Sequence, residues 1–212
     1  MPRHKFRTRE SYSRRGPTRE PYDVVLIVCE GQKTEPFYFE GLRAAYGLSS
    51  ANIVVRPMGR DPLSLVDFAI SELERDDTFT HAYCVFDRDG HATFDAAIQK
   101  SRDCALGKRG RLRLAVSVPC FEIWPLLHFR FSSAAIVAGG GKTPGEKALA
   151  LLQNEMPDYL KGSRGIFEKL APKLDAALQY AEKLCQHNQE SDSDNPSTTI
   201  HDLVNYLMRL KQ

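Results

Sequence analysis

Four short apolar runs are spaced along the chain, and each has the length and composition of a β-strand. They cover residues 22–30 (YDVVLIVCE), 52–57, 81–89 and 112–119. The first run is almost continuously apolar, a pattern typical of a strand that is buried on both faces of a sheet. Helix-start signals lie between the runs: Thr34 and Pro36 open one segment. Asp61 and Pro62 open the next, as a cap and a first turn.

The order of these elements indicates an α/β fold. Strands that alternate with helices, joined by connections long enough for crossovers, predict a parallel sheet of about four strands flanked by helices. Residues 120–131 (CFEIWPLLHFRF) are predicted to be helical, and the character of the chain changes after them. Residues 144–187 are predicted to be helices broken near Pro157 and 162–165, followed by a polar loop at 189–199 and a final helix.

Charge divides the chain into unlike parts. Residues 1–21 carry seven basic and two acidic side chains, a net charge of +5, whereas the whole chain of 212 residues has a net charge of +2. We predict a basic, disordered tail over 1–21, an α/β core over 22–131, and a helical C-terminal extension over 132–212 that packs on the core. A basic tail can bind phosphate backbones without sequence preference, but a solvated tail with no partner has the same composition.

Hydropathy and cysteine usage bear on location. No apolar run approaches the roughly 20 residues that a membrane helix needs, and the polar N-terminus lacks the apolar stretch of a secretory signal. The five cysteines form no CxxC pair and no His/Cys spacing typical of a zinc site. We therefore expect a cytoplasmic protein with reduced cysteines, no structural zinc and no membrane partner.

Acidic residues recur where the predicted strands end. Glu30 closes the first strand, and Glu122 follows the end of the fourth. The third ends with Asp87 and Asp89 on one side and Arg88 on the other. The carboxyl ends of parallel strands meet at one edge of a sheet, where ligands bind. Crowded carboxylates repel one another, and Mg²⁺ relieves that repulsion while keeping waters for a phosphate. The pattern therefore predicts a Mg²⁺ site, with Mn²⁺ as the alternative metal, suited to phosphodiester hydrolysis.

Longer stretches of the chain resemble the RloB family. They are VCEGQKTEPFYFEGL, CVFDRDGH, LAVSVPCFEIWPLLHF and NPSTTIHDLVNYL, in this order and spacing, and they lie within residues 22–131 and 195–210. RloB-like proteins are bacterial, are found beside an AAA-type ATPase in phage-defence (abortive-infection) loci, and have a Toprim-like fold. The resemblance therefore implies a Toprim-like sheet and an ATPase partner.

The same resemblance implies roles for particular acids. Glu30 matches the Toprim glutamate, and Asp87 and Asp89 match the Toprim DxD pair, which together bind Mg²⁺ and cut or join phosphodiesters. Glu35 and Glu122 belong to the RloB pattern, and we predict that one or both complete the metal site. The segment 195–199 also belongs to that pattern.

Two functions from different classes follow. The first is a Mg²⁺-dependent nuclease that acts as the effector of an ATPase-coupled anti-phage defence system, with DNA or RNA as its substrate and transfer RNA among the candidates. The second is a non-catalytic sensor or effector subunit that binds nucleic acid or the ATPase, with an acidic cluster that serves structure alone. Assembly as a homo-oligomer is open in either case.

Several basic residues are candidates for contact with nucleic acid. Lys33, in the turn after the first strand, is placed to touch a substrate phosphate and is grouped with the catalytic residues. Arg88 lies between the two aspartates, and a basic loop contains Lys108, Arg109 and Arg111. Solvated turns and loops have the same composition, so these predictions depend on charge alone.

Three further features have simpler structural explanations. GGGKT (139–143) matches the end of a P-loop, but the motif's first glycine is absent, so we predict a flexible loop. His128, in LLHF, is predicted to be a buried side chain rather than a general acid. The segment 195–199 is predicted to cap the final helix, with Thr199 and Asp202 resembling a capping box.

Overall fold

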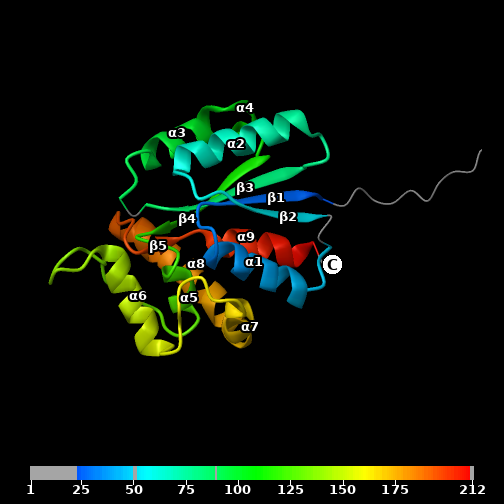
Figure 1. The fold of residues 1–212 in the computed structure, drawn as a ribbon. Coiled ribbons are helices and arrows are strands. Elements are labelled where there is room, and N and C mark those ends of the chain that lie inside the picture. The colour runs from blue at the N-terminus through cyan, green and yellow to red at the C-terminus, as the bar shows by residue number, and fades with distance from the viewer. Residues whose placement is uncertain (1–22, 50–51, 89, 211–212) are drawn as a thin grey trace, which may run out of the picture.

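Helices cover both faces of a central β-sheet in the computed structural model, which describes residues 23–49, 52–88 and 90–210 (Figure 1). The strands are β1 (Val25–Cys29), β2 (Ile53–Pro57), β3 (His81–Asp87), β4 (Leu112–Val118) and β5 (Ser197–Thr198). The helices are α1 (Thr34–Ala45), α2 (Pro62–Arg75), α3 (Phe94–Asp103), α4 (Ala105–Lys108), α5 (Ile123–Leu127), α6 (Pro144–Glu155), α7 (Ile166–Leu170), α8 (Leu174–Ser191) and α9 (Ile200–Arg209), with a 3-10 turn at Ala171–Lys173. The predicted α/β class is confirmed. The predicted basic tail, 1–21, lies outside the described residues.

The sheet has the strand order β2-β1-β3-β4-β5. The four predicted strands are present and parallel, with Cys29 opposite Val85 and Asp87 opposite Ser117. This alignment brings the carboxyl ends of β1, β3 and β4 to the same edge. The fifth strand, β5, is absent from the prediction and pairs antiparallel with β4. Its two residues are too few to show a hydrophobic period, and they come from the segment predicted to be a polar loop.

The alternation of side chains along β1 explains its continuous apolar run. Leu26 and Val28 belong to the core cluster on the side of α2 and α3, whereas Val25, Ile27 and Cys29 belong to the cluster on the side of α1 and α9 (Figure 1). All five side chains are fully buried. A strand with helices on both sides must be apolar at every position, as predicted.

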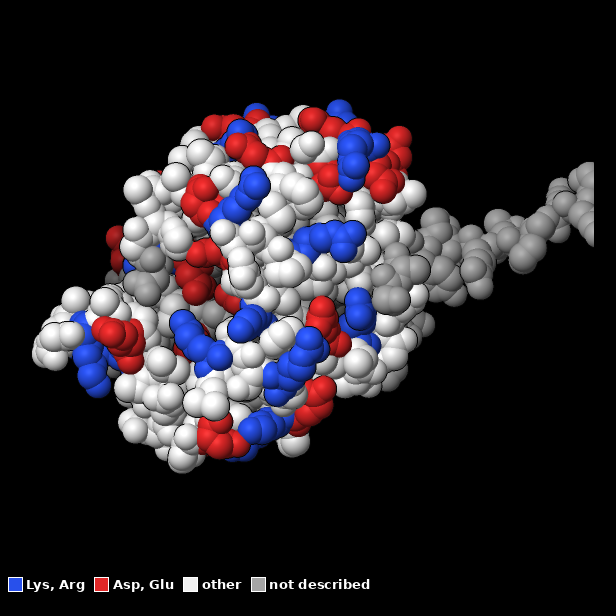
Figure 2. Space-filling view, in the orientation of Figure 1, with Lys and Arg blue, Asp and Glu red and all other residues white. Residues whose placement is uncertain are grey.

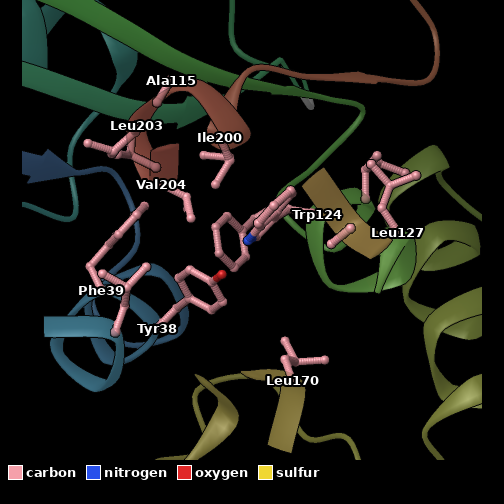
Figure 3. Close-up of a cluster of buried hydrophobic side chains, with 14 of the residues drawn as sticks. Tyr38, Phe39, Ala115, Trp124, Leu127, Leu170, Ile200, Leu203 and Val204 are labelled. Atoms are coloured by element: carbon pink, nitrogen blue, oxygen red, sulfur yellow. The ribbon is translucent and has the colours of Figure 1, made fainter. Parts of the chain in front are cut away.

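The C-terminal helices contribute to the larger of these two cores. Trp124 of α5 lies near Tyr38 of α1 and near Ile200 and Val204 of α9, and Leu170 of α7 belongs to the same cluster (Figure 3). The Trp124 and Tyr38 rings meet edge to face, with centroids 6.3 Å apart. The sheet and the C-terminal helices therefore bury their apolar side chains against each other. None of the helices in the described ranges has the length and apolar composition needed to span a membrane.

The helix predicted over 120–131 is shorter in the structure. Only the five residues of α5 are helical, and the chain continues in turns. Phe129 and Phe131 then pack against the core, each beneath a lysine ammonium group. The chain leaves the helical path after α5, and the two rings pack against the core from this non-helical segment.

Side chains cap the starts of α2, α4 and α6, in α4 through Sγ of Cys104, which accepts from the Gly107 N–H at 3.2 Å. The predicted cap of α2 is confirmed, because Asp61 accepts a hydrogen bond from the Ser64 N–H at 3.3 Å. Thr143, the last residue of GGGKT, caps α6 in a reciprocal capping box with Glu146. The lysine and threonine that match a P-loop thus lie in a turn and at a cap before a helix.

The predicted capping role of Thr199 is wrong. Thr199 stands at the start of α9 but makes no capping hydrogen bond, and its Oγ1 accepts one from the Val116 N–H of β4 at 2.9 Å. Asn195 instead binds both backbone polar groups of Ile136 through its side-chain amide. Thr198 of the same segment does bind the start of α9, because its Oγ1 accepts from the Ile200 N–H at 3.3 Å, so the prediction that 195–199 caps the final helix holds for Thr198 alone.

We expect Thr199→Val to lower the free energy of unfolding by about 1–2 kcal/mol, because it leaves the half-buried Val116 N–H without an acceptor. Valine has nearly the shape of threonine, so packing changes little. Thr199→Ser keeps the hydroxyl and is expected to stay within about 0.5 kcal/mol of wild type. Urea unfolding measures all three proteins. Equal stability of the valine variant and wild type would contradict this prediction.

Candidate active site

The carboxyl edge of the sheet gathers acidic side chains from several elements. Glu35 of α1, Asp87 at the end of β3 and Glu122 just before α5 line one pocket of about 330 Å³. Glu30, which follows β1, adjoins this pocket by accepting a hydrogen bond from the Asp87 N–H at 3.1 Å. Figure 2 shows acidic atoms at the bottom of a hollow on this face, with basic side chains along one side. The fifth predicted ligand, Asp89, lies outside the described residues.

Glycine at position 31 makes room for one of these carboxylates. A Cβ atom on Gly31 would lie 1.9 Å from Oε2 of Glu35 and 2.7 Å from its Oε1. A larger residue at position 31 would therefore push the Glu35 carboxylate away from its present position in the pocket.

Burial and mutual repulsion disfavour the charged form of two of the acids. Burial is the main reason that the pKa of Glu35 rises from 4.5 to about 7, and the nearby carboxylates of Glu122 and Glu30 act in the same direction. The pKa of Asp87 also lies well above its ordinary value, mainly through burial and next through Glu35. A backbone hydrogen bond from Phe121 opposes that rise. The surroundings therefore favour the protonated, neutral form of both acids.

Glu122 differs from these acids because a lysine reaches it. Its side chain is only 1% exposed, and its Oε1 lies 3.2 Å from the Lys161 Nζ and 3.2 Å from the Tyr159 hydroxyl, which donates to it. Burial is the largest influence and lowers the pKa of Lys161, but Glu122, Cys120 and Asp87 together outweigh it, so this pKa lies above its ordinary value. The other oxygen, Oε2 of Glu122, has no hydrogen-bond partner among the described residues.

Lys161 and Tyr159 are absent from the sequence prediction. Both lie between α6 and α7, in a segment predicted only as a break between helices. A lone lysine in a polar loop has no motif or spacing that marks it, so no sequence signal identifies it as a neighbour of Glu122.

The two histidines nearest the site have different environments. The Nε2 of His91 lies 2.5 Å from Oε1 of Glu30, so His91 is a direct neighbour of the acidic cluster. His128 is buried, and its Nδ1 lies 3.0 Å from the Trp124 carbonyl oxygen. Burial lowers the pKa of His128 to about 4. His128 is buried as predicted, but its Nε2 has no hydrogen-bond partner among the described residues, so its ring is not fully satisfied.

The basic loop before β4 lies away from this pocket. Lys108, Arg109 and Arg111 precede β4, which runs parallel to β3, so they lie at the amino edge of the sheet and the acids at the carboxyl edge. The Arg111 guanidinium donates to the backbone carbonyls of Phe79 and Thr80 at 2.6 and 3.2 Å. The structure therefore gives Arg111 a role in holding two chain segments together.

The two remaining basic candidates lie at the carboxyl edge. Arg88 forms a two-pronged ion pair with Asp194, in the loop before β5. Lys33 precedes α1, is exposed, and lines the same pocket as the acids. Of the predicted basic residues, Lys33 is thus the one that the structure brings to the carboxylates.

The donor set fits a hard divalent cation in its chemistry. Carboxylate oxygens are the ligands that Mg²⁺ prefers. Oε2 of Glu122 has no hydrogen-bond partner among the described residues, and the raised pKa values of Glu35 and Asp87, which come mainly from burial, would fall on binding a cation. Among the described residues, no group of three or more His, Cys, Asp or Glu side chains is arranged to hold a metal ion. Two of the carboxylates hold Lys161 and His91 instead, and these partners would have to give way.

Comparison with known proteins gives one match. A family model described as RloB-like protein matches residues 25–207. No curated protein and no solved structure matches the chain. The matched range contains every acid of the pocket together with Tyr159 and Lys161.

The raised pKa of Glu35 predicts a pH-dependent penalty on stability. The pKa of this carboxyl is about 7 in the folded state against an ordinary 4.5, so it binds more protons when the protein is folded. The free energy of unfolding therefore falls as the pH rises from about 4.5 through about 7. Without divalent metal, Glu35→Gln should raise the free energy of unfolding at pH 8 by on the order of 2–3 kcal/mol. At pH 4 the two proteins should be nearly equal.

Chemical denaturation in EDTA at the two pH values measures this difference. Glu74→Gln, on the exposed side of α2, is the matched control and should show no pH-dependent gain. If Glu35→Gln changed stability equally at pH 4 and pH 8, Glu35 would not titrate in this window.

Proposed function

The chain belongs to the RloB-like family, and from this premise we propose that it is a Mg²⁺-dependent nuclease that hydrolyses phosphodiesters. One observation carries the proposal. Three carboxylates from separate elements, Glu35, Asp87 and Glu122, line a single pocket at the carboxyl edge of the sheet, and Glu30 adjoins it. Proteins seldom place unpaired acids together unless a cation or a reaction requires them.

The ligand set that we propose consists of Asp87, Glu122 and Glu35 in the pocket, with Glu30 beside them. Asp89 joins this set through the family resemblance. When bound, Mg²⁺ supplies charge stabilisation at the phosphoryl group and an activated water. Glu30 also fixes the end of β3, because its Oε2 accepts the hydrogen bond from the Asp87 N–H.

The chain's own side chains handle the proton and the phosphate. The pKa of Glu35, about 7, means that its carboxyl is partly protonated near neutral pH in the metal-free protein and gives up that proton when it binds the cation. Lys33 lines the pocket from the exposed side, where its ammonium group can bind a non-bridging phosphate oxygen. The proposal thus places Glu35 in the metal site and gives Lys33 the binding of the substrate phosphate.

The family resemblance extends the proposal to a partner and a setting. We propose that the nuclease is the effector of an anti-phage defence system in which an AAA-type ATPase controls cleavage. Its substrate is DNA or RNA, with transfer RNA among the candidates. Phosphodiester chemistry is common to all of these.

A second candidate function has one observation in its favour. Lys161 already neutralises part of the acidic cluster through Glu122, as it would in a cluster that serves structure alone. The chain would then be a non-catalytic subunit that binds nucleic acid or the ATPase.

Cleavage of plasmid DNA, total RNA and transfer RNA distinguishes the two functions. We expect wild type to cut one of them with Mg²⁺ or Mn²⁺, alone or with the ATPase, and Asp87→Asn to lose about 100-fold or more of that activity, because it removes a charge from the metal site. Asp95→Asn, on exposed α3, is the matched control and should cut like wild type.

One result of this assay would refute the nuclease proposal. If wild type and Asp87→Asn were equally silent with both metals and with the ATPase, while each still bound the ATPase or nucleic acid, the nuclease proposal would fail. The non-catalytic function would then account for the pocket.

A further inference from the structure

A lysine ammonium group occupies part of the acidic pocket. The Nζ of Lys161 lies 3.2 Å from Oε1 of Glu122, and the Tyr159 hydroxyl donates to the same oxygen at 3.2 Å. Glu122 lines the pocket together with Asp87 and Glu35. The position beside this oxygen is thus already held by a cation from the chain itself.

Lys161 and Tyr159 provide partners for only one of the two carboxylate oxygens of Glu122. Oε2 of Glu122 is buried and has no hydrogen-bond partner among the described residues. A buried, unpartnered carboxylate oxygen is costly, and a divalent cation carries twice the charge of an ammonium group and takes oxygen ligands directly. Replacement of Lys161 by such a cation would relieve a cost that Lys161 leaves in place.

The loop that carries Lys161 is anchored beside it. The Gly162 N–H donates to Oγ1 of Thr34, in the first turn of α1, at 2.9 Å. Gly162 has a φ of +74°, and a Cβ there would lie 3.0 Å from the Cβ of Lys33. Tyr159 is buried on the other side of Lys161. Only a glycine allows this close approach, so the backbone on both sides of Lys161 is held in place.

The Lys161 side chain is nevertheless free to leave. It is 56% exposed, whereas the Glu122 side chain is 1% exposed. A flexible four-carbon stem lets the ammonium group swing into solvent while the anchored backbone stays where it is. Departure of the cation therefore requires no unfolding of the loop.

We propose that Lys161 is the resident counter-ion of the pocket and competes with a divalent cation for Glu122. This inference rests on the metal site of the proposed function. The metal binds by displacing the ammonium group, so Lys161 lowers the apparent metal affinity. Loss of Lys161 should therefore tighten metal binding, and a cation of similar reach should preserve the competition.

Mn²⁺ binding to the full chain tests the proposal without any measurement of cleavage. Isothermal titration calorimetry and the electron paramagnetic resonance signal of free Mn²⁺ both report the dissociation constant. We expect Lys161→Met to bind Mn²⁺ about five- to tenfold more tightly than wild type, the gain from removing a partly buried ion pair. Lys161→Arg should stay within about twofold of wild type, since it keeps the charge.

Lys33→Met is the matched control, because Lys33 lines the same pocket and no ion pair joins it to a carboxylate among the described residues. It should change Mn²⁺ affinity by less than about twofold. Thermal unfolding checks that each variant is folded. Lys161→Gln is measured alongside and should bind like Lys161→Met, which covers the case that the methionine variant does not fold.

Each contrary outcome has its own meaning. If Lys33→Met and Lys161→Met increased Mn²⁺ affinity equally, the increase would come from the lower net positive charge alone. The proposal that Lys161 competes with the metal for Glu122 would then be wrong. Unchanged affinity in both Lys161→Met and Lys161→Gln, with wild-type binding that Asp87→Asn removes, would overturn the competition and leave the metal site standing. Failure of every variant and wild type to bind Mn²⁺ would overturn both.

Discussion

Repulsion among carboxylates held in a partly buried space is the constraint to which the rest of the site responds. Acids from separate elements meet at one sheet edge, where water screens their charges less than it does at an open surface. The structure responds with raised pKa values at two acids, with Lys161 beside Glu122, and with His91 beside Glu30. Each response neutralises one acid locally, and none removes an acid from the pocket.

The sheet forces these acids together, and its two cores fix their direction. Tyr83 and Val85 of β3 belong to the core on the α1 side, so Asp87, two residues further, points to the same side. Glu35 and Glu122 lie there, on α1 and before α5. A slip of β3 by one residue would exchange its two faces and carry Asp87 away from them. Burial on both faces of the sheet thus protects the geometry of the site.

Local periodicity and chain order are enough to predict the strands and the acids that end them, because both are properties of short segments. Chain order also explains why the basic loop at 108–111 misses the site: it precedes β4 and so lies at the opposite edge, which charge alone does not reveal. Lys161 and Tyr159 could not be predicted, since packing of α7 against α1 brings their loop to the acids. The role of Thr199 as a hydrogen-bond acceptor could not be predicted for a similar reason, because it depends on the pairing of β5 with β4, which the sequence does not indicate.

The distribution of partners separates the acids into two kinds. Two of them hold Lys161 and His91, whereas Asp87 and Glu35 have no ion-pair partner among the described residues. Both unpaired acids line the pocket, and burial raises the pKa of both. These two acids are therefore the ones whose charged form a divalent cation would stabilise most. An acidic cluster that served structure alone would be stabilised by pairing each member, so this uneven pairing favours metal chemistry over a purely structural role.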